Sequence, residues 1–417
     1  MDISNRVRRL CAVATVTVLS VLAVGASPGV AQDASPAASS APASCAPAAG
    51  TKHVSIVDKD MTDEEIAAAI AAEGSLTVGN WTYTANDELV NQFQAYVKDT
   101  YGVDIKLNYV GSQAPSTYMT ALAAAKQSGT EAPYDVMAVE ENYWADGVAQ
   151  DLVQDFLPSG LVPNQDLLLP GFQHVPNALA FQAASFIALM YNKDTQPWIK
   201  SFLDLADPRL KGKVTIPPGG DIGAGGFLLA LAAELGKDYK DPEQMKQVVD
   251  WVKTNLIDSG NVVKVTNTQS ELQSLLESGQ ADAEVYWNAS TRLEYFGGHT
   301  NIAQVVPQQL YPINGYLWIP KGAPHPVLAQ TFINWRLCPE VQFPNSWNIG
   351  HGPWAELSEG LLGDAYVSHI PDWFQADYYN YYLTLDQIKS SLQTLDWPAF
   401  NASAKVFQDY YLQVLGQ

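Results

Sequence analysis

The chain has 417 residues, 47% hydrophobic and 11% aromatic, which is enough for two domains with substantial cores. Acidic residues outnumber basic ones 44 to 23, for a net charge of −21 at pH 7. This balance argues against nucleic acid or an anionic lipid surface as a partner, because both are recognised by clusters of basic residues. With only three cysteines, a disulfide-dense scaffold is also excluded.

The N-terminal residues have the pattern of a secretory signal peptide. Arginines precede an uncharged apolar run at residues 10–25, and small residues follow it up to Ala31. The run is shorter than a comfortable membrane span. We therefore predict that residues 1–31 are a signal peptide and that the mature protein is exported. The pattern leaves open whether the protein stays in the periplasm, on the cell surface or in the medium, and whether export follows the Sec or the twin-arginine route.

Residues 32–50 are almost entirely Ala, Ser, Pro and Gln, a composition that predicts a flexible linker. Cys45 lies in this linker. A lipid-bearing cysteine would directly follow the apolar run, and Cys45 comes well after it, so we expect a free cysteine and leave lipidation open. A disulfide between Cys45 and Cys338 is not expected, because it would join a flexible linker to a predicted helix.

From residue 51 onward, helix and strand patterns alternate. Apolar residues recur at helical spacing in three segments, with short apolar or alternating runs between them. The predicted elements, in chain order, are a helix at 61–73, a strand at 76–79, a helix at 86–100, a strand at 104–110, a helix at 115–127 and a strand at 134–139 that is followed by a helical turn. This order predicts a parallel sheet covered by helices.

The middle of the chain repeats this alternation, and the tail is mainly helical. Asp241 precedes Pro242 as an N-cap, and Thr268 with Glu271 forms a capping-box pattern. The predicted elements are strands at 186–192, 213–216, 262–265, 283–287, 301–306 and 316–319, and helices at 223–235, from 242, at 269–277, at 326–337 and at 403–415. The pattern predicts a second α/β segment followed by a helical tail.

No motif for catalysis or cofactor binding is evident in the sequence. It lacks a nucleotide-binding lysine loop, a HExxH motif and a CxxC pair. The six histidines have no metal-ligand spacing, so each is expected to be packed or at the surface. We therefore predict no catalytic residue, no metal ion and no cofactor. A secreted hydrolase using Glu140 or Glu141 is a remote alternative, since such a carboxylate needs a second acid–base group.

Aromatic and acidic side chains gather where the predicted strands end. In open α/β sheets, ligands bind beyond the carboxyl ends of the strands. Three strands end in Asn80–Tyr83, Glu140–Trp144 and Trp287–Ser290, and the strand at 213–216 leads into a glycine-rich turn that contains Asp221. Aromatic walls with a few carboxylates suit an amine cation, through cation–π contacts and charge-assisted hydrogen bonds.

Several stretches, in this order and spacing, resemble the extracytoplasmic solute-binding proteins of ABC importers, within the spermidine/putrescine-binding branch. They are Asn80–Tyr83, Tyr134–Met137, Ser201–Leu205, Lys211–Val214, Trp287-Asn288, Ile319–Ala323 and Phe332–Trp335. The resemblance implies an α/β, two-lobed periplasmic-binding-protein-like fold of type II, with two hinge crossings and a ligand cleft between the lobes. The expected domains are the signal peptide 1–31, the linker 32–50, a first lobe of 51–185 plus 312–417 and a second lobe of 186–311.

The resemblance also implies a function without chemistry: capture of a small solute and its delivery to the transmembrane permease subunits of an ABC importer. A polyamine such as spermidine or putrescine is the favoured ligand, and ferric iron, thiamine, a phosphonate or a sugar are the alternatives. Asn314 stands where the family usually has an aspartate, with Tyr311 as the aromatic near it. The predicted ligand-binding residues are Trp81, Tyr83, Glu140, Glu141, Tyr143, Asp221, Trp287, Asn288, Tyr311 and Asn314.

Overall fold

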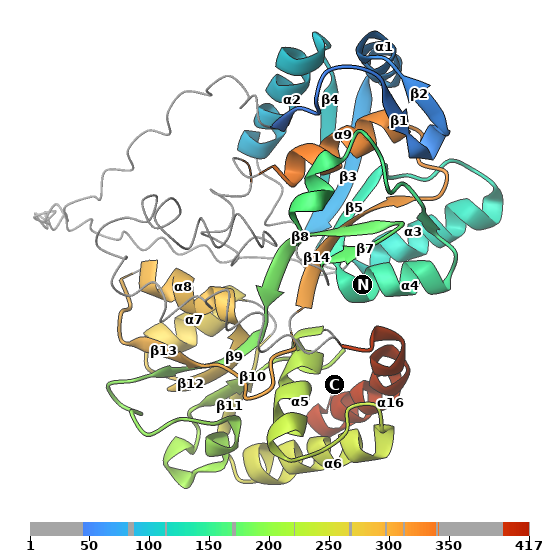
Figure 1. Cartoon of the computed structure of the whole chain (residues 1–417). Helices are drawn as coiled ribbons and strands as arrows, with labels where there is room; N and C mark the ends of the chain where they lie inside the picture. Colours follow the sequence, from blue (N-terminus) through green and yellow to red (C-terminus); the bar gives the residue numbers. More distant parts are fainter. Residues whose placement is uncertain are drawn as a thin grey trace, which may run out of the picture. The chain divides into compact units, whose positions relative to one another are not determined.

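The structure is a computed structural model, and it describes residues 45–81, 87–112, 115–168, 172–220, 222–266, 269–296, 298–311, 313–338, 341 and 395–416. The predicted signal peptide and most of the predicted linker lie outside these residues. Within them, the chain forms a mixed α/β fold with a seven-stranded and a five-stranded sheet (Figure 1). We call the seven-stranded sheet with its helices the first body, and the five-stranded sheet with its helices the second body.

The first sheet has a parallel half that the sequence predicts well. Its strands β3 (Ser75–Trp81), β4 (Lys106–Ser112) and β5 (Val136–Glu140) are parallel, with β3 in the centre. Helices α2 (Asp87–Tyr101) and α3 (Ser116–Ser128) connect them in sequence. Ahead of β3, helix α1 (Asp63–Glu73) begins at a capping box. These elements confirm the β-α-β-α-β order.

The other half of the first sheet is antiparallel, which corrects the expectation of an all-parallel sheet. Strand β14 (Ile313–Pro320) pairs antiparallel with β5 on one side and with β8 (Ala178–Ser185) on the other. The short strands β6 (Val153–Gln154) and β7 (Gln173–His174) complete the sheet. The reason is topological: β8 leads the chain out of this sheet and β14 brings it back, so neither follows a βαβ connection.

The second sheet has the strand order β11-β10-β12-β9-β13. Its strands are β9 (Ile187–Asn192), β10 (Val214–Ile216), β11 (Val262–Val265), β12 (Ala283–Trp287) and β13 (Ile302–Val305). Its helices are α5 (Ile222–Glu234), α6 (Pro242–Val252), α7 (Gln269–Glu277) and α8 (Asn288–Phe296). Asp241 caps α6 as predicted, whereas Thr268 lies outside the described residues.

The chain passes between the two bodies at two places. It leaves the first sheet between β8 and β9, at Phe186, and returns between β13 and β14. Helix α5 packs against both crossings at Gly226, where a Cβ would lie 2.5 Å from Ile187 Cγ1 and 3.5 Å from Ile313 Cδ1. A glycine is needed here because any side chain would displace the crossing strand.

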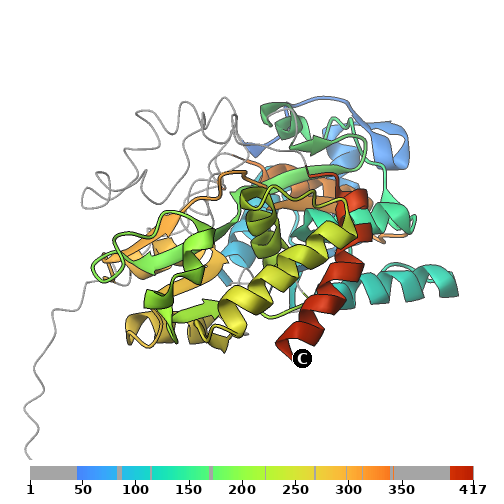
Figure 2. The same ribbon diagram turned by 90° about the horizontal axis from the view of Figure 1, so that it is seen from below.

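The tail divides between the two bodies, so assigning all of 312–417 to the first lobe is wrong. Helix α9 (Pro326–Arg336) packs in the first core, whereas α16 (Trp397–Leu415) packs in the second. Figure 2 shows α16 alongside α6, and the Tyr411 hydroxyl donates to the Pro217 carbonyl oxygen at 3.1 Å. The apolar face of α16 is evident from sequence, but its spacing cannot specify which core it covers.

Cys45 and Cys338 form a disulfide, with Cα atoms 5.2 Å apart, which corrects the expectation of a free cysteine. Cys45 is fully buried, and its carbonyl oxygen accepts hydrogen bonds from Asn334 Nδ2 at 2.9 Å and the Tyr96 hydroxyl at 3.2 Å. The chain then forms a hairpin of β1 (Lys52–Val54) and β2 (Lys59–Met61). The last part of the predicted linker is therefore packed on the first body, and the sulfur of Cys45 is not available to a lipid.

We predict that removing the disulfide by Cys45→Ala with Cys338→Ala lowers the free energy of unfolding by about 2–5 kcal/mol, because the bond links distant parts of the chain. Urea titration of the oxidised protein measures this. Adding a reductant should destabilise the wild type and leave the double variant unchanged. A mature protein that carries two free thiols, or a lipid on Cys45, by mass spectrometry would contradict the bond.

We predict that Phe407→Ala lowers the free energy of unfolding by about 3–5 kcal/mol, because Phe407 is fully buried where α16 enters the second core. Its neighbour Val406 is 39% exposed, so Val406→Ala is the matched control and should cost less than about 1 kcal/mol. Urea unfolding of both variants is the measurement. Equal, small effects would mean that α16 does not pack on this core.

Candidate functional site

The ends of β3, β5 and the start of β14 share one edge of the first sheet. Because β3 and β5 are parallel and paired at Asn80–Ala138, Trp81 and Glu140 come at the same edge. Strand β14 runs antiparallel, with Gly315 opposite Glu140, so Asn314 lies there too. Trp81 and Glu140 are both partly exposed. The predicted residues Tyr83 and Asp221 lie outside the described residues.

Glu141 is a buried carboxylate at this edge that has partners on two other strands. It is the first residue of α4 (Glu141–Ala149) and is only 6% exposed. Its Oε1 lies 2.9 Å from His174 Nε2, on β7, and its Oε2 accepts a hydrogen bond from Asn314 Nδ2 at 3.3 Å. Three elements thus fix one carboxyl group. The structure brings Asn314 and His174 to Glu141, and no sequence pattern marked His174.

An aromatic stack surrounds His174. The Trp144 ring lies 4.1 Å from the imidazole, nearly parallel at 14°, and the Tyr316 ring lies 4.7 Å from it. Trp144 Nε1 also donates to Asn177 Oδ1 at 3.1 Å. Burial, with the nearby charge of Glu141, raises the pKa of Tyr316 well above its usual value, so its hydroxyl stays protonated. The stack therefore holds the imidazole, and through it Glu141, in one orientation.

Trp287 and Asn288 stand at the end of β12 in the second sheet. Trp287 is partly exposed and packs on the second core. Asn288 is 3% exposed and is bonded to the first crossing: its backbone N–H donates to the Phe186 carbonyl oxygen at 2.9 Å, and its Oδ1 accepts from the Phe186 N–H at 3.3 Å. Asn288 therefore joins the start of α8 to the first crossing by two hydrogen bonds. The sequence did not predict this structural role.

Tyr311, Tyr143 and the glycine-rich turn have packing roles. Tyr311 meets the Tyr239 ring edge-on at 5.5 Å, and burial raises the pKa of Tyr311 to about 12. Tyr143 packs against the first core. In the turn before α5, a Cβ on Gly219 would lie 2.6 Å from Leu412 Cδ2 of α16. The glycine there is explained by this close approach.

The model of the bacterial extracellular solute-binding protein family matches residues 88–355, well over half of the chain. The chain belongs to this family. Its members bind solutes outside the cytoplasm, which agrees with the predicted export and with a binding rather than a catalytic role. Among the described residues, no helix is both long and apolar enough to cross a membrane. No curated protein sequence gives a significant match.

Solved structures share this fold at low sequence identity. A protein assigned to a spermidine/putrescine ABC transporter of Listeria monocytogenes is 18% identical, with a TM-score of 0.62 over 82% of this chain and 99% of its own. The spermidine/putrescine substrate-binding protein PotD of Streptococcus pneumoniae is 18% identical, with a TM-score of 0.60 over 81% and 99%. AgtB of A. tumefaciens R10, solved with agropinic acid, is 16% identical, with a TM-score of 0.57 over 82% and 99%. These likenesses confirm the two-lobed fold.

We predict that Asn314→Asp destabilises the protein by about 1–3 kcal/mol at pH 7, because it places a second carboxylate beside the buried Glu141. Repulsion raises the pKa of the pair in the folded state above its unfolded value. The unfolded chain then binds fewer protons near neutrality, so the loss is largest at neutral pH and shrinks as the pH falls.

Urea unfolding at a series of pH values measures this effect. Asn314→Ala is the control, since it removes the hydrogen-bond donor without adding a charge and should give a loss that varies little with pH. Parallel pH profiles for the two variants would show that Asn314 does not face Glu141.

Proposed function

We propose that this protein captures a small cationic amine, of the polyamine class that includes spermidine and putrescine, and delivers it to the transmembrane subunits of an ABC importer. The observation that carries the proposal is the carboxylate of Glu141, buried at the edge where the strands of the first sheet end and held there by His174 and Asn314. A fixed, desolvated negative charge at a ligand-binding edge favours a cation.

Glu140 is the carboxylate best placed to touch the solute. It precedes Glu141 at the end of β5 and is partly exposed, whereas Glu141 is only 6% exposed. We therefore assign direct contact to Glu140 and a supporting electrostatic role to Glu141. A charge-assisted hydrogen bond to an ammonium group contributes about 1.5–3 kcal/mol.

The aromatic residues at the strand ends supply the apolar part of the proposed site. Trp81 ends β3 and Trp287 ends β12, and both are partly exposed. An indole face can cover the methylene groups of a polyamine and attract its ammonium groups, which contributes about 0.5–2 kcal/mol for each cation–π contact. In this proposal one tryptophan comes from each body, so the solute favours the arrangement in which both contact it.

Solutes without positive charge are weaker candidates, because two carboxylates lie at the proposed site. Two structurally similar proteins carry spermidine/putrescine names, and a third was solved with agropinic acid, so the fold does not select the ligand. An anion such as a phosphonate would meet the charges of Glu140 and Glu141. Ferric iron, thiamine and a sugar are the remaining alternatives. A hydrolase is the least supported, since the groups beside Glu141 hold it in place.

Calorimetric titration of spermidine and putrescine into the mature protein tests the proposal. We expect binding in the micromolar range or tighter. It should be at least about tenfold weaker in Glu140→Gln, which loses a charge-assisted hydrogen bond, and about two- to thirtyfold weaker in Trp287→Ala, which loses a cation–π contact. Trp198→Ala and Glu243→Gln are matched controls: Trp198 lies beyond the far end of β9 and Glu243 is exposed on α6, so both should bind as the wild type does.

Two outcomes separate the parts of the proposal. If neither amine binds below millimolar concentration while a sugar or an anion does, the cationic ligand is wrong and the transport role stands. If an amine binds equally well to all four variants, the ligand class stands and the strand-end site is wrong.

A further inference from the structure

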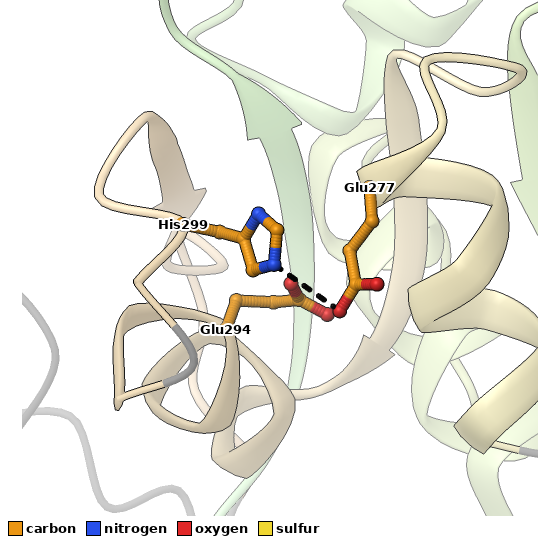
Figure 3. A group of neighbouring side chains, drawn as sticks. All are labelled: Glu277, Glu294 and His299. Carbon is orange, nitrogen blue, oxygen red and sulfur yellow. Dashed lines mark ion pairs between the residues drawn. The ribbon is translucent and has the colours of Figure 1, made fainter. Parts of the chain in front are cut away.

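Three polar side chains form a cluster in the second body, away from the strand ends that carry the proposed solute site. Glu277 is the last residue of α7, Glu294 lies in α8, and His299 follows in the turn that leads to β13 (Figure 3). One potential ligand atom from each residue lies within 4.8 Å of those of the other two. His299 Nε2 is 3.5 Å from Glu277 Oε1. Glu294 is about 9 Å along the α8 axis from Asn288, at 1.5 Å per residue.

Glu294 is the unusual member of this group. Its side chain is 1% exposed, and neither carboxylate oxygen has a partner at full hydrogen-bond geometry, although the Gln273 side chain lies near enough to offset part of the rise in its pKa. Figure 3 shows this carboxylate directed at His299 and Glu277. A buried carboxylate without partners costs several kcal/mol unless a compensating charge or donor is present. Burial, with the charge of Glu277, accordingly raises the pKa of Glu294 to about 7.

A second buried carboxyl group adds to the local need for positive charge. Glu284 on β12 is 1% exposed, its Oε2 also lacks a hydrogen-bond partner, and the charge of Glu294 adds to burial in raising its pKa. Among the side chains that the structure describes, no lysine or arginine nitrogen lies within 4.0 Å of either carboxylate. The imidazole of His299, which has a ring nitrogen within 4.8 Å of a Glu294 carboxylate oxygen, is a potential cation in this group.

The backbone holds the three residues in place without a bound ion. The His299 N–H donates to the Glu294 carbonyl oxygen at 2.9 Å, and the Ile302 N–H donates to the His299 carbonyl oxygen at 3.1 Å. Glu277 is fixed by the end of α7, where Gly279 takes the left-handed conformation at φ +69°. A site whose ligands are held this way loses little conformational entropy on binding.

We propose that Glu277, Glu294 and His299 bind one divalent transition-metal ion of the Zn²⁺ class, with water in the fourth position. Imidazole nitrogen and carboxylate oxygen are ligands of Zn²⁺, at about 2.0–2.2 Å, and the 3.5 Å between His299 Nε2 and Glu277 Oε1 lets one ion contact both. Ca²⁺ and Mg²⁺ are disfavoured, because they require more oxygen ligands and avoid imidazole.

The bound ion links α7, α8 and the turn before β13. It also supplies the positive charge that the buried Glu294 lacks, so it binds the folded chain and not the unfolded one. By linkage, it stabilises the second body by an amount set by its concentration relative to its dissociation constant. This site is independent of the solute site, since Glu294 and His299 lie at the opposite end of α8 from Trp287.

Zn²⁺ titration into tag-free, chelator-treated mature protein is the test, by calorimetry and by the visible spectrum of a Co²⁺-loaded sample. We expect one Zn²⁺ per chain, a melting temperature that rises with Zn²⁺, and binding at least tenfold weaker in His299→Ala and in Glu277→Gln. Glu277 is exposed, so the second variant should fold normally; circular dichroism and the melting temperature without metal check both.

The matched control is His53→Ala. The His53 ring is half exposed and lies 3.0 Å from Asp60 and 3.9 Å from Asp58, so it tests whether any histidine beside carboxylates gives the same signal. We expect wild-type Zn²⁺ binding in this variant. No binding by the wild type, or full binding by His299→Ala, would overturn the proposal. Spermidine titration of His299→Ala keeps this result separate from the solute proposal, since amine binding should be unchanged.

Discussion

The constraint on which the rest of the structure depends is the passage of two chain segments between the sheets. At the first, Phe186 joins β8 to β9 and exchanges two hydrogen bonds with Asn288. At the second, Ile313 begins β14, and α5 packs on both crossings where Gly226 has no side chain. The start of α8 therefore lies beside the first crossing, and β14 begins at the second. The residues that we assign to the solute, Trp287 and Glu140, stand next to them.

Glu141 was predicted from the sequence as a ligand-binding residue, and the structure shows hydrogen-bond partners for it within the protein. Both of its carboxylate oxygens are held within the protein, by His174 and Asn314, and the stack of Trp144 and Tyr316 holds His174. In the proposed function its charge acts on the ligand through space, while its hydrogen bonds join α4 to β7 and β14. In the proposed function, direct contact is assigned to Glu140, which is partly exposed at the same strand end.

Local signals were predictable from the sequence, and long-range partners were not. The start of α6 follows from the cap of Asp241 and the fixed φ of Pro242, and β11 and β12 follow from short apolar runs. Nothing local indicates that Cys45 meets Cys338, 293 residues away, or that α16 joins the second core. His174 and His299 were not predicted as partners of Glu141 and Glu277, because each of these ion pairs joins residues that are far apart in the sequence. The apolar runs located the strand ends, but only the folded structure shows which side chains face one another.

Each terminal segment of the described chain packs mainly on one body. The disulfide and the β1–β2 hairpin close the first body, and α16 covers α5 and α6 in the second. Between the bodies, α16 also contacts α4, where Asn401 Nδ2 donates to Asp146 Oδ1 at 3.2 Å. A single hydrogen bond of this kind contributes about 0.5–1.5 kcal/mol, far less than either core. Ala145 of α4 also packs on the second core, so apolar contact adds to this hydrogen bond. In the proposed function, a solute that contacts both bodies adds binding energy to the arrangement in which it touches both.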